Sequence, residues 1–419
     1  MERYEKYKPS GIEWIGEVPE HWVRKSFKLA TDIIMGQSPS GDDIKDEGNC
    51  LFMQGNAEFG EKYPNAVYYC DNCSKHSRVG DILMSVRAPV GELNYSDQVY
   101  GIGRGLCSIK PTDISSGFLW YYLWKSKEDF NAFANGSTFT AITVETLKSF
   151  PMIIPPLAEQ EAIAAYLDAR CADIDKVVAT QEKRIALLKE LKQSVITQAV
   201  TRGLNPDVKM KDSGVEWIGE VPEHWEVEKI KFCFDVYAGA TPKTEVKDYW
   251  DGDIVWVTPA DYKTEDKYIK GGQRTITKKG YDSCNTQVAP QGSIIFSKRA
   301  PIGTVAINEV MLCTNQGCLS CVPKGTNSLF YYYVISIATE YFDLLGSGAT
   351  FKEISADSFS NVKLPCPPID EQNAIAEFLD QRCGSIEKQI EAVTKQIELL
   401  REYKQSLITE VVTGKRKVC

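Results

Sequence analysis

The sequence predicts an α+β protein built from two copies of one unit, which are related by an internal pseudo-two-fold repeat. Each copy consists of a globular domain and a long α-helix. Two observations predict this fold class. A stripe of apolar residues with helical spacing runs up to Gly203, and most of the first half of the chain recurs in the second half. A repeat of about 210 residues indicates a duplicated domain, because solenoid units are much shorter.

The first long helix is expected from Glu159 to Arg202, directly after the helix-breaking pair Pro155-Pro156. Gly203 and Pro206 end it, as a C-terminal glycine and a following proline usually do. At 1.5 Å per residue this helix spans on the order of 65 Å, so much of it needs a partner beyond one globular core. Its apolar residues recur at spacings of three, four or seven on one face: Ile174, Val178, Ile185, Leu188, Leu191 and Val195.

The partner is a second long helix. Pro367 to Thr413 repeats Pro155 to Thr201 at a constant offset of 212, with about half of the positions identical. A stripe that lay on a single domain would not account for duplication in matched register, so we expect the two helices to bury their stripes against each other. The second half of this predicted helix-pair interface is Ile386, Ile390, Ile397, Leu400, Tyr403 and Leu407.

Each globular domain begins with nearly the same turn-rich segment. Ser10 to Trp22 returns as Ser213 to Trp225 with a single difference. Its tryptophans and isoleucines are expected to anchor the segment to a core. His21 and His224 lie in it, and with only three histidines in the chain a packed or surface role is favoured over a ligand role.

Short strands, an aromatic-rich helix and a glycine loop are expected between each anchor and its long helix. Matched pairs support this order: the strand and turn at 80–91 and 292–303, the helices at 118–133 and 330–345, and the loops at 135–139 and 347–351. In contrast, 49–76 and 251–285 cannot be matched convincingly. Two recognition domains with different targets would show such divergence, and ordinary drift of surface loops would show it too.

The composition excludes a broadly basic nucleic-acid binder and a membrane protein. The net charge is −9, so DNA contacts must come from local basic faces. No apolar run reaches membrane-spanning length. Thirteen cysteines without a signal peptide indicate reduced thiols in a cytosol.

Catalytic and cofactor motifs are missing. Glu61 and Tyr63 break the ending of a phosphate loop, and Gly101 to Gly105 lacks the third glycine of a dinucleotide fingerprint. Cys70-Cys73 and Cys318-Cys321 have zinc-like spacing but occupy non-equivalent places in the repeats, which argues against metal. A methyltransferase would also need an Asn/Asp-Pro-Pro-aromatic motif, which the Pro-Pro pairs here lack.

The duplicated motif set resembles the specificity (S) subunit of type I restriction–modification systems. The resemblance rests on the twin Glu-Trp-Ile-Gly-Glu-Val-Pro-Glu-His-Trp segments, the Arg-Ala-Pro turns, the Gly-Ser/Ala-Thr-Phe loops, and the twin Pro-Pro…Glu-Gln…Ala-Ile-Ala helices. Each motif is weak alone, whereas the duplicated set is specific and covers essentially the whole chain.

The resemblance implies a non-catalytic protein that binds double-stranded DNA with a bipartite target. Each globular unit would be a target recognition domain that reads one half-site. The helices would pair as an antiparallel coiled coil that acts as spacer and docks two methyltransferase (M) subunits, and restriction (R) subunits would join the full complex. No cofactor, metal or membrane is implied, and the location is cytoplasmic. The expected boundaries are 1–154 and 205–366 for the recognition domains, and 155–204 and 367–419 for the helices.

The family motifs do not say which side chains read DNA. Basic and aromatic residues of the divergent stretches and their neighbours are the candidates: Lys62, Tyr63, Lys75, Arg78, Lys263, Lys267, Tyr268, Lys270, Arg274, Lys278 and Lys279. Arg87 and Arg299 are added as phosphate contacts, with a structural role at the repeated turn as the alternative. A coiled-coil adaptor that binds only proteins remains a competing interpretation, which DNA footprinting of a complex would separate.

Overall fold

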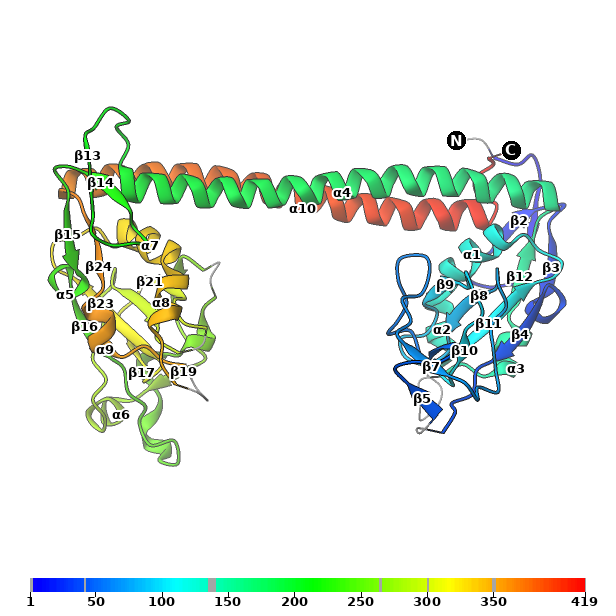
Figure 1. Cartoon of the computed structure of the whole chain (residues 1–419), viewed down its shortest axis with the longest axis horizontal. Helices are drawn as coiled ribbons and strands as arrows, with labels where there is room; N and C mark the ends of the chain where they lie inside the picture. The colour runs from blue at the N-terminus through cyan, green and yellow to red at the C-terminus, as the bar shows by residue number, and fades with distance from the viewer. Residues whose placement is uncertain are drawn as a thin grey trace. The chain divides into compact units, whose positions relative to one another are not determined.

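The computed structural model describes residues 3–40, 43–134, 141–263, 266–299, 301–348 and 352–418 (Figure 1). The chain forms two compact units: unit 1 is Met1–Glu182 with Lys395–Cys419, and unit 2 is Lys183–Thr394. The α+β fold class is confirmed. Each unit has sheets and short helices, and the long helices α4 (Leu157–Arg202) and α10 (Ile369–Val412) each contribute to both units. No helix within these described ranges is long and apolar enough to cross a membrane.

Unit 1 is built on an antiparallel sheet in the order β4-β11-β8-β9. A second sheet, β10-β6-β7-β5, contains the divergent stretch, and two ribbons pair β1 with β2 and β3 with β12. The strands are β1 (Tyr7–Pro9), β2 (Glu17–Pro19), β3 (Val23–Ser26), β4 (Thr31–Met35), β5 (Ile44–Lys45), β6 (Leu51–Met53), β7 (Tyr68–Cys70), β8 (Ile82–Ser85), β9 (Leu93–Tyr95), β10 (Gly101–Ile102), β11 (Leu106–Pro111) and β12 (Pro151–Ile154). The short helices are η1 (Phe27–Leu29), α1 (Ser116–Lys125), α2 (Lys127–Ala134) and α3 (Val144–Ser149).

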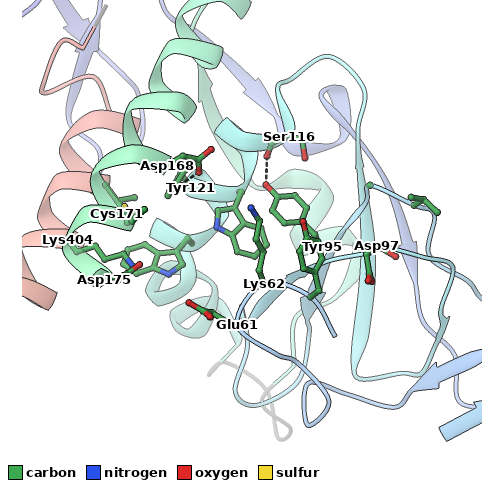
Figure 2. Close-up of a pocket in the computed structure, with 18 residues that line it drawn as sticks. Glu61, Lys62, Tyr95, Asp97, Ser116, Tyr121, Asp168, Cys171, Asp175 and Lys404 are labelled. Atoms are coloured by element: carbon green, nitrogen blue, oxygen red, sulfur yellow. Dashed lines mark hydrogen bonds and ion pairs between the residues drawn. The ribbon is translucent and has the colours of Figure 1, made fainter. Parts of the chain in front are cut away.

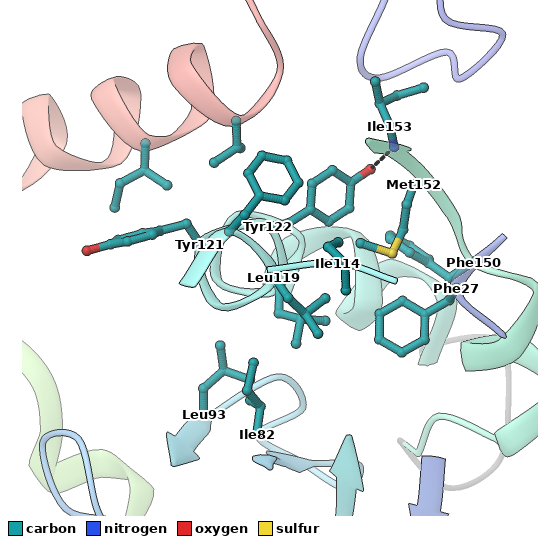
Figure 3. Close-up of a cluster of buried hydrophobic side chains, with 14 of the residues drawn as sticks. Phe27, Ile82, Leu93, Ile114, Leu119, Tyr121, Tyr122, Phe150, Met152 and Ile153 are labelled. Atoms are coloured by element: carbon teal, nitrogen blue, oxygen red, sulfur yellow. Dashed lines mark hydrogen bonds between the residues drawn. The ribbon is translucent and has the colours of Figure 1, made fainter. Parts of the chain in front are cut away.

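The core of unit 1 forms where α1 packs against the main sheet (Figure 3). Ile82 and Leu93 come from the sheet and Leu119 from α1. The buried Tyr122 hydroxyl accepts a hydrogen bond from the Ile153 amide at 3.3 Å and donates one to the Pro151 carbonyl at 3.2 Å. This satisfied phenol ties α1 to β12, the strand that leads into α4.

Unit 2 repeats this plan with a sheet in the order β16-β23-β20-β21-β18, a second sheet β19-β17-β22, and the ribbons β13-β14 and β15-β24. Its strands are β13 (Met210–Asp212), β14 (Glu220–Pro222), β15 (Glu226–Lys229), β16 (Phe234–Ala238), β17 (Trp250–Val257), β18 (Tyr268–Ile269), β19 (Arg274–Ile276), β20 (Ile294–Ser297), β21 (Val305–Asn308), β22 (Leu312–Thr314), β23 (Cys318–Pro323) and β24 (Lys363–Cys366). Its short helices are α5 (Ile230–Cys233), η3 (Lys247–Tyr249), η4 (Pro259–Asp261), α6 (Lys278–Asp282), α7 (Ser328–Ile337), α8 (Thr339–Leu345) and α9 (Ala356–Ser360).

The aromatic-rich helices and one anchor residue differ from the sequence-based expectation. Each aromatic-rich segment forms two helices, with the break at Ser126 between α1 and α2 and at Ala338 between α7 and α8. Trp14, expected as a core anchor, is 43% exposed and packs beside Phe150. The glycine loop expected at 135–139 lies outside the described residues, as do positions 349–351 of its copy.

The divergent stretches share a backbone that their sequences hide. In unit 1, β6 pairs in parallel with β10, with Phe52 opposite Gly101. In unit 2, β17 pairs in parallel with β22, with Trp256 opposite Cys313, which is the repeat counterpart of Gly101. The same strand therefore opens both divergent stretches, and the expectation that they cannot be matched is corrected at the level of backbone.

The long helices run antiparallel within each unit. In unit 1, Ile174 in the first half of α4 shares a buried cluster with Leu407 near the end of α10. In unit 2, Ile196 near the end of α4 shares one with Leu379 near the start of α10. Gly203 follows α4 with φ of 73° and Gly414 follows α10 with φ of 71°, so both helices end at a left-handed glycine.

Most of the proposed stripe faces the opposite helix. Ile174, Ile386, Ile397 and Leu407 are buried, and Val178, Ile185, Leu188, Val195, Ile390 and Leu400 are half-buried. Leu191 and Tyr403 depart from the expectation because they remain 42% and 48% exposed. At that turn the next residue in the chain faces the opposite helix: Lys192 in one copy and Lys404 in the other.

Those two lysines make the same ion pair in both units. Lys404 Nζ lies 2.7 Å from each carboxylate oxygen of Asp175 in unit 1. Lys192 Nζ lies 2.6 Å from Glu387 Oε1 in unit 2. Because Lys192 and Asp175 are the repeat counterparts of Lys404 and Glu387, the helix register is fixed twice by one duplicated interaction.

The repeated anchor segments attach each globular domain to the first turn of a long helix. Trp22 Nε1 and His21 Nε2 lie 3.0 and 2.6 Å from the carboxylate of Glu159 in unit 1. Trp225 and His224 hold Glu371 in the same way, at 2.9 and 2.6 Å. Both histidines lie at the surface and make a structural contact, in line with the packed or surface role expected of them. The contacts also explain the Glu of the repeated Glu-Gln pair.

The N-terminal segment of unit 1 is also held by residues near the C-terminal end of the chain. The Tyr7 hydroxyl donates to the Gly414 carbonyl at 3.0 Å, and Lys415 Nζ donates to the Glu17 carbonyl at 2.6 Å. Val411 and Val412 of α10 are fully buried in the same core as Trp22. The anchor of unit 1 is therefore completed by residues almost four hundred positions away.

Candidate nucleic-acid interface

The second sheet of unit 2 presents a fixed arginine. The Arg274 guanidinium on β19 lies 3.4 Å from the ring centroid of Trp250, which packs edge-to-face on Trp256 at 5.1 Å. Both indoles donate to backbone carbonyls, at 3.2 Å for Trp250 and 3.0 Å for Trp256. Stacking on an anchored indole restricts the plane of the exposed guanidinium, and a fixed fork suits bidentate recognition of guanine.

Two lysines accompany it on α6, which follows β19 directly. Lys278 pairs with Asp282 at 2.5 Å and Lys279 with Asp248 at 3.5 Å, while the lysine side chains remain 72% and 75% exposed. Exposed ion pairs of this kind contribute little to stability, so both ammonium groups can leave their carboxylates and bind phosphate. We name Arg274, Lys278 and Lys279 the distal patch, because β19 and α6 lie at the end of unit 2 remote from α10 (Figure 1).

The other candidates in unit 2 lie between η4 and β19. Lys263 is exposed, Tyr268 is 45% exposed, and Lys270 pairs with Glu309 at 3.4 Å while remaining 80% exposed. Lys267 differs from them. Its ammonium forms an ion pair with Asp380 on α10 and its side chain is only 25% exposed. The structure thus places Lys267 against the long helix instead of on an open reading surface.

In unit 1 the candidates are dispersed. Lys62 and Tyr63 lie on the loop between β6 and β7, with the Lys62 ammonium 6.0 Å from the centroid of the Tyr63 ring. Lys75 is exposed on the segment after β7, and Arg78 pairs with Asp32 at 2.9 Å. The structure therefore brings no compact basic cluster together in unit 1 from these candidates.

The repeated Arg-Ala-Pro turns differ in their partners. Arg299 pairs with Glu353 at 2.8 Å, and Lys298 contacts the same carboxylate at 2.7 Å. The hydrogen bond from Lys298 is the main reason that the pKa of Glu353 lies below its usual value. Arg87 forms the equivalent β-bridge with Ala141, which has no carboxylate, and within the described part of the chain Arg87 makes no ion pair. Arg299 is thus engaged at the turn, while Arg87 keeps a charge available for phosphate.

No metal site is found among the residues that the structure describes: they contain no group of three or more His, Cys, Asp or Glu side chains arranged to hold an ion. Cys318 and Cys321 are buried in β23, where burial raises the pKa of both thiols. The chain thus consists of two copies of one domain, and each copy has its own divergent second sheet.

Comparisons with known proteins identify the family. The sequence model described as "Type I restriction modification DNA specificity domain" matches residues 19–189 and 222–396. The putative type I restriction enzyme MjaX specificity subunit of Methanocaldococcus jannaschii is 28% identical over 96% of this chain and 96% of its own length. The MjaIX specificity subunit of the same organism is 40% identical, over 44% of this chain and 43% of its own.

A solved chain from work on complex assembly and conformational transition of the type I R-M system aligns with a TM-score of 0.76. It is 16% identical, and the alignment covers 94% of this chain and 98% of that one, so it shows the shared fold. The chain belongs to the DNA specificity family of type I restriction–modification systems.

Proposed function

We propose that the two recognition domains, 1–154 and 205–366, read the two halves of one bipartite double-stranded DNA target without catalysing a reaction. The carrying observation is that a shared scaffold presents a divergent sheet at the same place in each copy, with Phe52 at the position of Trp256. In unit 2 this sheet carries Arg274 stacked on Trp250, an arrangement that suits bidentate recognition of a base.

The helix segments 155–204 and 367–419 are proposed to set the spacing of the half-sites and to dock two methyltransferase subunits, with restriction subunits joining in the cytoplasm. An exposed apolar pair supports two docking surfaces. Leu187 and Leu191 are 64% and 42% exposed, and their repeat counterparts Leu399 and Tyr403 are 54% and 48% exposed. A duplicated apolar patch on the outside of the helix pair fits two copies of one partner.

Methylation mapping tests this function. The chain is expressed with the methyltransferase subunit of its own system in cells that lack other methylation, and modified bases are mapped. We expect an asymmetric motif of two short half-sites separated by a nonspecific spacer. No methylation, or a single uninterrupted motif, would contradict the proposal.

A substitution in the distal patch should separate base reading from phosphate binding. Arg274→Ala should cost about 1–3 kcal/mol at one base pair of the half-site read by unit 2 and relax that position. Lys279→Ala, as the matched control, should weaken binding to all sequences and reduce the salt slope by about one. Affinities of the complex for duplexes changed at one position each, at fixed salt, measure this. A uniform loss for Arg274→Ala would mean that it holds phosphate.

A further inference from the structure

Unit 1 contains an open cleft of about 970 Å³ between the recognition domain and the long helices (Figure 2). Asp168 and Asp175 on α4 and Lys404 on α10 form one wall. Lys62 and Tyr95 face them from the recognition domain (Figure 2). We call this space the unit 1 cleft. Its volume is at the upper end of the range of sites that enclose a ligand, and it is larger than one side chain would fill.

The lining of the unit 1 cleft is acidic and aromatic. Four carboxylates, those of Glu61, Asp97, Asp168 and Asp175, face two lysines, and one of these, Lys404, is already bonded to Asp175. Trp120, Trp124 and Tyr63 add aromatic faces. Such a lining repels DNA phosphates and favours a cation whose aliphatic stem can lie along the rings.

Unit 2 reveals what the equivalent position binds. Asp380 and Tyr333 are the repeat counterparts of Asp168 and Tyr121. There Lys267 pairs with Asp380, and its ammonium lies 5.8 Å from the Tyr333 ring centroid. The Tyr333 hydroxyl is buried and has no hydrogen-bond partner in the described part of the chain. The carboxylate has thus taken a lysine in place of the neighbouring phenol.

In unit 1 the equivalent carboxylate, that of Asp168, is bound by the neighbouring phenol and not by a lysine. The Tyr121 hydroxyl donates to Asp168 Oδ1 at 2.7 Å, and Asp168 makes no ion pair among the described residues. The corresponding lysine, Lys62, is present but makes no ion pair with Asp168. Its backbone position is equivalent: the Lys62 carbonyl accepts from the Tyr95 amide at 2.8 Å, as the Lys267 carbonyl accepts from the Ile307 amide at 2.9 Å. The Lys62 ammonium lies 5.7 Å from the Tyr95 ring centroid.

We propose that the unit 1 cleft binds a lysine- or arginine-bearing segment of the methyltransferase subunit, with Asp168 accepting the cation as Asp380 accepts Lys267. The assignment of this partner rests on the proposed function. A polypeptide segment is favoured because the occupant seen in unit 2 is a lysine on a chain, and because the cleft has room for neighbouring residues. The competing occupant is Lys62 itself.

A peptide probe tests the chemistry of the cleft without the partner. Acetyl-Arg-Gly-Arg-amide is titrated into the full chain and tryptophan fluorescence is followed, since Trp120 and Trp124 line the cleft. We expect saturable binding that is at least fivefold weaker for the citrulline analogue and for Asp168→Asn. Asp173→Asn, on the same helix with its side chain 72% exposed and outside the cleft, should change nothing. No arginine-dependent saturation, or no loss in Asp168→Asn, overturns the proposal.

The complex then tests the partner. In native mass spectrometry of the full chain with its methyltransferase subunit, Asp168→Asn should weaken retention of a methyltransferase copy about tenfold, and Asp173→Asn should not. This loss should persist in a Lys62→Ala background. If Lys62→Ala alone weakens retention as much as Asp168→Asn does, and Asp168→Asn causes no further loss in the Lys62→Ala background, then Lys62 is the occupant and the proposal is wrong. If the wild-type complex assembles and methylates normally and Asp168→Asn equals it, the cleft proposal alone fails.

Discussion

A fragment ending at Asn205 should form a homodimer through an isologous helix interface. In unit 1, Ile174 of α4 is covered by Leu407 of α10. The repeat counterpart of Leu407 is Val195, which the fragment retains. Because α4 is one continuous helix, its second half cannot fold back onto its first half. The cover must therefore come from a second copy, whose Lys192 can also replace Lys404 beside Asp175.

The dimer carries two identical recognition domains. With methyltransferase subunits, it should modify an inverted repeat of the first half-site instead of the asymmetric target. Sedimentation equilibrium measures the dimer and methylation mapping measures the motif. Gln181→Val gives a matched test: Gln181 Oε1 is buried without a partner in the described residues, and the second copy has Val393 at this position.

In the fragment dimer Gln181 faces Gln181 of the second copy in place of Val393. The two amides can hydrogen-bond, but the apolar contact is lost, so Gln181→Val should tighten the fragment dimer. Val178→Asp, which puts a charge into the stripe, should give monomers. A wild-type fragment that sediments only as a monomer, or that still methylates the asymmetric site, would rule out replacement of one helix by the other.

The second large effect is expected from lengthening the helices. Four residues inserted after Ala179 in α4, and four after its counterpart Glu391 in α10, keep the apolar stripes on one face. The paired insertions also keep Asp175 with Lys404 and Lys192 with Glu387. Each helix grows by about 6 Å, on the order of two base pairs at 3.4 Å each. The methylated motif should keep both half-sites and gain about two base pairs of spacer.

A single insertion, in α4 alone, is the control. It displaces one duplicated ion pair relative to the other, so the complex should lose stability without gaining a defined longer spacer. If the paired insertion leaves the spacer unchanged, the helices do not set the half-site separation.

The fold could be predicted from sequence wherever a pattern was both periodic and duplicated. The long helix expected at 159–202 is observed at 157–202, and its partner is observed at 369–412. Burial of Leu191 and Tyr403 was overestimated because spacing alone cannot decide between two adjacent residues at the edge of a stripe. Lys192 lies on the inner side there because a carboxylate on the opposite helix faces it.

The candidate site was less predictable because it depends on contacts between distant residues. Lys62-Tyr63 corresponds to Lys267-Tyr268 in backbone position, but the offset there is 205 and not 212, so alignment at a constant offset missed it. The signal was present in the acidic-Lys-Tyr triplet that both copies contain. Only the structure shows that one of these lysines is held by a long helix.

Unit 1 is complete only when residues 395–419 have joined it, and this determines when unit 1 can fold during synthesis. Unit 2 is continuous in sequence and can be completed while α10 is still being made. Residue 395 leaves the ribosome roughly 10–40 s after residue 182, at about 5–20 residues per second. During that interval Ile174 and the rest of its apolar face lack their cover. The domain that is translated first is therefore completed last, and a nascent chain stalled before Leu407 carries an exposed helix ready to capture another copy.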